Sequence, residues 1–221
     1  ISERLIMAFG EVGTSLSKVK ANSLNLAGTY GFSGTVSGLA DETPLVLIST
    51  FTSDGSDATA VFTSGINSTY KEYLFVLNDI HPQTDGAVFE FQASTNTGSS
   101  YGVTATTTCF DAVGDEANEN QGLGYRTASD LAQSTSFINL NRNSGGDNDQ
   151  ASSGVIRLYN PSSTTFVKHF TSRVIGNWAA NGSFDTFTAG YFNTTSAVDA
   201  VQFKFASGEI QGGTIDLFGV V

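Results

Sequence analysis

A serine or cysteine nucleophile needs a base such as histidine beside it, and histidine is scarce in this sequence. There are two histidines, His81 and His169. His81 precedes a proline, His169 lies in an alternating apolar stretch, and neither is near a Gly-x-Ser-x-Gly motif. The single cysteine, Cys109, fits a small buried apolar residue better than a reactive thiol. We therefore expect structural roles for both histidines, no catalytic triad and no enzyme activity.

Acidic residues gather in two stretches, and a glycoside hydrolase needs two carboxylates across a sugar bond. Catalytic carboxylates usually come from strands that frame a cleft, whereas loop clusters such as these are usually only solvated. The second stretch offers several oxygens for Ca²⁺ but lacks the spacing and closing glutamate of an EF-hand. A turn formed by Asx side chains explains it equally well, so both interpretations stay open. The stretches comprise Asp111, Asp115, Glu116 and Glu119, and then Asp147 and Asp149.

Exposed aromatic rings are a third source of chemistry, because a ring can stack on the flat face of a sugar. Trp178, which lies near Asn177 and Asn181, is one candidate, and Tyr101 and Tyr125 are two more. Aromatic residues make up 11% of the sequence, so most of them are expected in a core. Trp178, Tyr101 and Tyr125 are therefore the candidate ligand-binding residues.

The composition excludes some partners. The net charge is -11 and only 10 residues are Lys or Arg, which is the opposite of the basic surface that nucleic acid requires. No apolar stretch approaches the length of a membrane span, and the start lacks the pattern of a signal peptide. We expect neither nucleic-acid binding nor membrane insertion, and one cysteine leaves no internal disulfide.

Alternation of apolar and polar residues predicts an all-β fold. Val201, Phe203 and Phe205 fall on every second position, which is the period of a half-buried strand. The number of such segments fits an eight-stranded jelly-roll-like antiparallel β-sandwich with extra edge strands. Residues 111–131 lack strand character, and 128–131 fit one helical turn. The predicted strands span residues 45–51, 58–63, 70–80, 87–94, 102–109, 137–140, 154–159, 166–178, 185–193, 198–206 and 213–219.

The first forty residues differ from the rest. Apolar residues are thinly spaced through 1–40, too sparse to build a core, so we expect an extended N-terminal arm that serves assembly or anchoring. Asp41 to Pro44 mark the boundary. The sequence therefore predicts an arm over 1–40 and a jelly-roll domain over 41–221.

Several segments of the domain bear a family resemblance, namely residues 65–73, 78–82, 159–163, 190–194, 202–208 and 213–219. Together they resemble the C-terminal jelly-roll domain of virion structural proteins from tailed, mostly marine, bacteriophages. The resemblance covers about residues 45–221. It implies a module on the virion exterior, in a tail fibre or spike or as a capsid decoration, and usually a homo-oligomer. It brings no catalytic residues with it.

We therefore expect a non-enzymatic structural protein, assembled in the host cytoplasm and exposed on the virion, that mediates assembly and host-surface attachment. The expected partners are further copies in a trimer, other virion proteins and a host-surface glycan; no cofactor is expected apart from the Ca²⁺ alternative. The alternative function is a carbohydrate-binding β-sandwich module. A polysaccharide depolymerase is disfavoured, since the sequence has no repeat of fixed period.

Overall fold

The computed structural model describes residues 44–221, and within them the chain forms twelve β-strands and no helix that could cross a membrane. Neighbouring strands pair antiparallel throughout. The strands are β1 (Leu45–Thr52), β2 (Ala60–Phe62), β3 (Glu72–Pro82), β4 (Phe89–Ser94), β5 (Ala105–Asp115), β6 (Gln121–Tyr125), β7 (Ile138–Asn139), β8 (Ser152–Tyr159), β9 (Lys168–Trp178), β10 (Gly182–Phe192), β11 (Ala200–Phe205) and β12 (Ile210–Val220).

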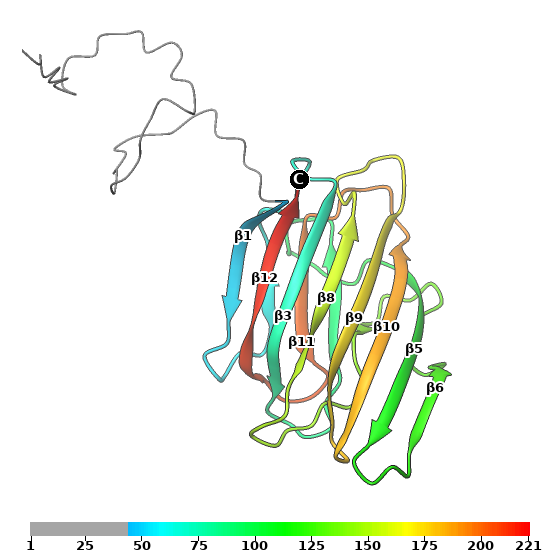
Figure 1. Ribbon diagram of the computed structural model, residues 1–221. Helices are drawn as coiled ribbons and strands as arrows, with labels where there is room; N and C mark the ends of the chain where they lie inside the picture. The colour runs from blue at the N-terminus through cyan, green and yellow to red at the C-terminus, as the bar shows by residue number, and fades with distance from the viewer. Residues whose placement is uncertain (1–43) are drawn as a thin grey trace, which may run out of the picture. The chain divides into compact units, whose positions relative to one another are not determined.

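The strands form two sheets that pack as a sandwich, with the eight-stranded sheet in front in Figure 1 and the four-stranded sheet behind it. The strand orders are β1-β12-β3-β8-β9-β10-β5-β6 and β2-β11-β4-β7. Four pairings are nested along the chain, namely β1 with β12, β2 with β11, β3 with β8 and β4 with β7. This nesting over two sheets is the jelly-roll topology, so the predicted fold class is confirmed.

Two pairs of strands interrupt the jelly roll and widen its larger sheet. β5 and β6 follow β4 in the chain, and β9 and β10 follow β8. In space they lie side by side beyond β8, and β6 forms the edge (Figure 1). β10 pairs along its whole length, from Gly182 to Phe192, with both β9 and β5. The extra strands therefore make one broad, regular surface.

The core lies between the two sheets and is built mainly from phenylalanine. The ring of Phe203 on β11 lies 5.3 to 6.1 Å, centroid to centroid, from the rings of Phe62, Phe75, Phe89 and Phe91. Phe75 belongs to the eight-stranded sheet, so these contacts join the two layers. Burying one such side chain contributes about 1.5–3 kcal/mol. The alternation in β11 therefore holds the sandwich together.

The inner face of β5 and β10 is polar, in contrast with this core. Asp111 is 4% exposed and accepts hydrogen bonds from Arg126 at 3.0 Å and Arg142 at 3.3 Å. The guanidinium of Arg142 also lies 4.5 Å from the centroid of the Trp178 ring. Both arginines come from the segment between β6 and β8, which also contains β7, the edge strand of the smaller sheet.

The sequence interpretation of residues 111–131 was wrong. β5 continues to Asp115, β6 follows at Gln121–Tyr125, and 128–131 form no helix: the amide of Ser129 donates to the carbonyl of Arg126 in a single turn. The reason is that glycine occupies every second position of β6 and the whole strand is exposed, so its sequence shows no alternation of buried and exposed residues. The predicted arm, residues 1–40, lies outside the described residues.

Candidate functional site

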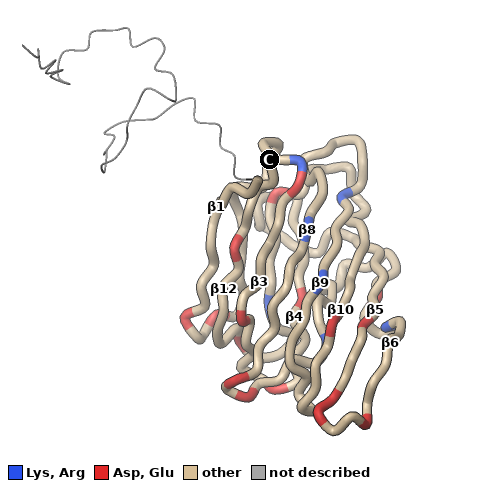
Figure 2. Tube along the Cα trace, viewed as in Figure 1, with Lys and Arg blue, Asp and Glu red and all other residues tan. Residues whose placement is uncertain are grey.

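The candidate site lies on the outer face, which we define as the surface of the eight-stranded sheet that points away from the four-stranded sheet. Phe170, Val174 and Phe184 are buried in the core, so the residues between them on β9 and β10 point to the outer face. Charged residues are sparse over this sheet, and acidic residues gather in the turns at its lower end (Figure 2). A broad face with little charge is suited to a neutral ligand.

Aromatic rings and one guanidinium cross this face in an aromatic row, formed by Arg173, Phe187, Phe110 and Tyr125. They are paired residues on β9, β10, β5 and β6 in turn. The rings of Phe110 and Phe187 are stacked with centroids 4.8 Å apart and planes 4° apart, and the Arg173 guanidinium lies 5.1 Å from the Phe187 centroid. Phe110 is 41% and Tyr125 54% exposed. The row therefore presents ring surface to the solvent on a rigid support.

The arginine of the aromatic row is held by a carboxylate. Arg173 donates from Nε and Nη2 to Asp185, with distances of 3.0 and 2.7 Å to Oδ1 and Oδ2. These hydrogen bonds raise the pKa of Arg173 above its ordinary value. The pair offers fixed donors and acceptors beside the rings, which is the combination that a polyhydroxylated ligand requires.

A shallow depression, of about 350 Å³, lies beside the aromatic row. Its floor is low because Ala189 carries only a methyl group, and Thr108 and Thr171 flank Ala189 on the neighbouring strands. On the side away from the aromatic row it is bounded by Tyr191, whose ring centroid lies 6.2 Å from that of His169. The hydroxyls and the ring edges therefore surround a space that a sugar unit would fit.

Polar side chains rim the depression at the Tyr191 end. Gln133, from the segment between β6 and β7, donates to Thr106 Oγ1 at 2.6 Å and to Tyr191 Oη at 3.4 Å. Asn193 donates in turn to Gln133 Oε1 at 2.6 Å. Such planar amide groups are suited to hydroxyl recognition. His169, for which the sequence indicated a structural role, is exposed beside this rim.

Of the three predicted ligand-binding residues, only Tyr125 lies in the aromatic row. Its hydroxyl donates to Asp130 Oδ2 at 2.7 Å, and this bond raises the pKa of Tyr125. Trp178 lies at the end of β9 on the inner side, packed against the core and under Arg142. Tyr101 precedes β5, near the opposite end of β10. The structure does not bring the three rings together.

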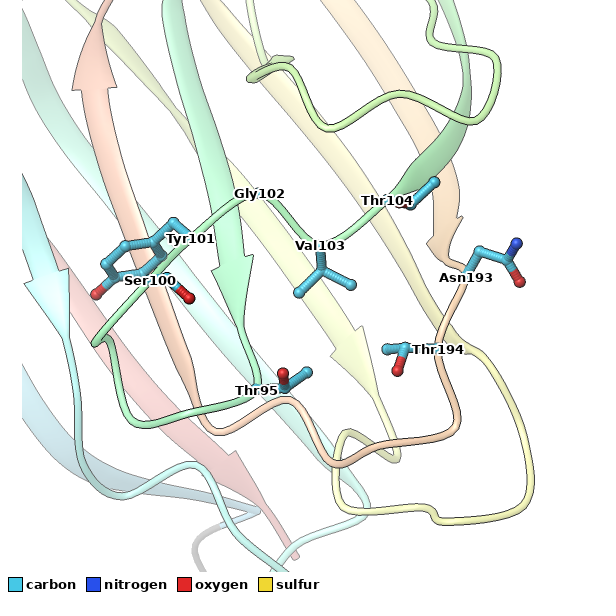
Figure 3. Close-up of a pocket in the computed structure, with 8 residues that line it drawn as sticks. All are labelled: Thr95, Ser100, Tyr101, Gly102, Val103, Thr104, Asn193 and Thr194. Atoms are coloured by element: carbon cyan, nitrogen blue, oxygen red, sulfur yellow. The ribbon is translucent and has the colours of Figure 1, made fainter.

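Tyr101 lines a second depression, of about 330 Å³, between the β4–β5 loop and the segment after β10. Figure 3 shows the side chains of Val103 and Thr194 pointing into it, while the Tyr101 ring is directed away. Burial and, to a lesser degree, the charge of Asp199 raise the pKa of Tyr101. This depression has no ring surface facing its interior and is a weaker candidate.

The acidic pair Asp147 and Asp149 lies in an exposed turn between β7 and β8. The amide of Asp147 donates to Gln150 Oε1 at 3.3 Å, and the amide of Gln150 donates to the Asp147 carbonyl at 2.8 Å, which accounts for the turn. Within residues 44–221 no group of three or more His, Cys, Asp and Glu side chains could hold a metal ion.

The chain matches no protein-family model and no curated protein. The site must therefore be judged on its geometry.

Sequence reasoning missed Phe110, Phe187 and Tyr191 because each lies in a strand that also supplies core residues. A signal was present, however. Phe184 and Phe187 in β10 have opposite parity, so they cannot share one face of the strand. An aromatic residue at one of the alternate positions that are otherwise polar therefore indicates a ring on the outer face.

Proposed function

We propose that the chain is a non-enzymatic structural protein of the exterior of a tailed-phage virion, whose jelly roll attaches to a host-surface glycan through the outer face. The observation that carries the glycan assignment is the aromatic row beside the depression at Ala189. Stacked rings supply apolar surface for a sugar face, while Arg173, Asp185 and the flanking threonines supply hydrogen bonds.

The assembly part of the proposal rests on the sequence resemblance and on residues 1–40, whose apolar residues are too sparse for a core. In the proposed mechanism these residues pair with neighbouring copies, which gives a trimer, and with other virion proteins. The sandwich then faces outward, and several copies of a weak glycan site act together, so avidity exceeds the affinity of one site.

Glycan binding is tested by applying the full chain to an array of bacterial surface polysaccharides and measuring affinity for the best ligand by calorimetry. Phe187→Ala should weaken binding by up to about tenfold, since one stacking contact is worth about 0.5–1.5 kcal/mol. Ala189→Leu should also weaken it by filling the depression. Phe166→Ala is the matched control, because Phe166 is 67% exposed and lies outside this face. Absence of binding, or unchanged affinity in both variants, contradicts the glycan assignment.

The virion assignment needs a separate experiment. Antibodies against the full chain should label the outside of phage particles from cells that carry its gene, as seen by immunoelectron microscopy. Labelling absent from intact particles would contradict the assignment, whatever the glycan result.

The alternative function is a carbohydrate-binding module that works alone, and the same outer face favours it. Light scattering of the full chain separates the two. A trimer that is stable to dilution supports the virion proposal, whereas a monomer that still binds glycan supports the module.

A further inference from the structure

β6 ends the eight-stranded sheet, and its outer edge is free in the described structure. The amide of Asp115 donates to the Asn120 carbonyl, and the amide of Arg126 donates to the Cys109 carbonyl. Backbone groups alternate in direction along an antiparallel strand, so residues of even number in β6 point toward β5. The amides and carbonyls of Gln121, Leu123 and Tyr125 therefore point away from the sheet.

This edge lacks the features that protect the other edges in the described part of the chain. β1, at the opposite edge, has a bulge between Leu47 and Ser49, and the edge strands of the smaller sheet, β2 and β7, have only three and two residues. β6 pairs with β5 without a register shift and contains no charged residue or proline. An unprotected edge of this kind is a template for another strand.

On one face β6 exposes the side chains of Gln121, Leu123 and Tyr125, and on the other face it has only glycines. Leu123 is 75% and Tyr125 54% exposed, and both lie on the outer face because Tyr125 pairs with Phe110. On the opposite face, a Cβ added to Gly122 or Gly124 would meet no atom within 4 Å. A second backbone can therefore approach without a steric clash, while Leu123 gains a neighbour.

The backbone amides and carbonyls of β6 that point away from the sheet can pair with the same groups of a second copy of β6. An antiparallel copy of β6 centred on Leu123 places Gln121 opposite Tyr125 and Leu123 opposite Leu123. Each of the three residues is then in a hydrogen-bonded pair, so all their free amides and carbonyls are satisfied. A contact that uses the same residues on both sides is a two-fold interface, the commonest kind between identical chains.

The charges near β6 favour this direction over the parallel one. Asp115 ends β5, and Glu116 and Glu119 belong to the β5–β6 turn, at the lower end of the sheet where acidic residues gather (Figure 2). Parallel pairing would set the two acidic turns side by side in a chain of net charge -11. Antiparallel pairing separates the two acidic turns. It also brings each turn near Arg126 of the partner chain, the residue that follows the partner's β6.

We propose that β6 pairs antiparallel with β6 of a second copy of this chain, about a two-fold axis at Leu123. The pairing joins two eight-stranded sheets edge to edge and extends both aromatic rows into one surface. It is independent of the proposed virion function and of any contact made by residues 1–40. Because only three residues of each copy pair, the contact is small, and the association should weaken on dilution.

A cysteine at the centre tests the geometry directly. Facing residues in a hydrogen-bonded pair have Cα atoms about 5.5 Å apart, within disulfide reach. Full-length Leu123→Cys should form a covalent dimer under mild oxidation. Val61→Cys is the matched control, since Val61 is 49% exposed on the edge strand β2, and the buried native Cys109 should not react. No dimer from Leu123→Cys, or an equal yield from the control, overturns the proposal.

A proline at the same position tests the backbone pairing. The Leu123 amide points outward, so Leu123→Pro removes no hydrogen bond within the chain, and proline is tolerated at such edge positions. Sedimentation of the full chain should show a lower mass for this variant than for wild type at the same concentration, with an unchanged circular dichroism spectrum. Leu123→Thr keeps the amide and should retain association. A wild-type mass that Leu123→Pro leaves unchanged contradicts the pairing.

Discussion

Phe110 and Phe187 are stacked face to face across two neighbouring strands on the outer face, with ring planes 4° apart. Both residues are held by full-length pairing between β5 and β10, and Arg173 approaches Phe187 from the next strand. A ligand would therefore meet rings that are already fixed, which lowers the entropy lost on binding.

The first prediction concerns the coupling of these two rings. In a double-mutant cycle with Phe110→Ala and Phe187→Ala, we expect the free energies of unfolding to be non-additive by about 0.5–1.5 kcal/mol, because each single variant already loses the stack. Urea unfolding of the four proteins measures this. Strict additivity would mean that the stack contributes no stability.

The second prediction concerns Asp111, whose Oδ2 accepts from Arg126 and Arg142. Asp111→Ala leaves both guanidinium groups without their partner. We expect a loss of about 2–3 kcal/mol in the free energy of unfolding, less than the 3–5 kcal/mol of a wholly buried pair, because the arginine side chains are about a quarter exposed. Thermal or urea unfolding gives the value, and Asp185→Ala on the exposed outer face is the control, with an expected loss under about 1 kcal/mol.

The third prediction concerns Glu90, which lies 3.5 Å from Lys204 on the smaller sheet and is 9% exposed. Burial raises its pKa, and the charge of Lys204 opposes this only in part. The folded state therefore keeps the proton to higher pH than the unfolded state, so this residue's contribution to stability is lost as pH rises from about 4.5 through the folded pKa.

Glu90→Gln removes this titration. Its stability relative to wild type should therefore increase between pH 4 and pH 7, as measured by urea unfolding at several pH values. A difference that does not change with pH would show that Glu90 titrates alike in both states.

Much of the fold could be predicted because its strands are half buried. In β11 the apolar residues Val201, Phe203 and Phe205 face the core, as their alternation indicates. The jelly roll followed from the number of such segments. The order of strands could not be predicted. β3 pairs with β12, which is far from it in the sequence, and no local sequence pattern indicates such a contact.

The site was harder to predict, since its rings lie on strands that also supply the core. The sequence predicts Tyr125 as a ligand-binding residue but not its strand, because Gly122 and Gly124 stand where a half-buried strand would have apolar side chains. For Phe110 and Phe187 the sequence offers only the general expectation for an aromatic residue, a place in the core. Only the pairing of β10 with β5 places them in contact.

The last prediction concerns Lys168, which is fully buried at the start of β9. Its ammonium donates to the carbonyls of Phe166 at 2.7 Å and Thr194 at 3.0 Å, and no carboxylate within residues 44–221 forms a salt bridge with it. Burial lowers the pKa of Lys168 below its ordinary value of 10.5. The unfolded state therefore binds more protons than the folded state between the lowered pKa and about 10.5.

The contribution of Lys168 to the free energy of unfolding should consequently rise as the pH increases from the lowered pKa toward about 10.5. Lys168→Met cannot titrate, so the free energy of unfolding of wild type minus that of the variant should increase as pH is raised from 7 toward 10. Urea unfolding at matched pH values measures this difference and cancels the titration of the tyrosines. Lys71→Met is the control for the loss of a lysine charge, since Lys71 is exposed. A difference for Lys168→Met that does not change with pH would mean that the ammonium is as well solvated in the folded protein as in the unfolded chain.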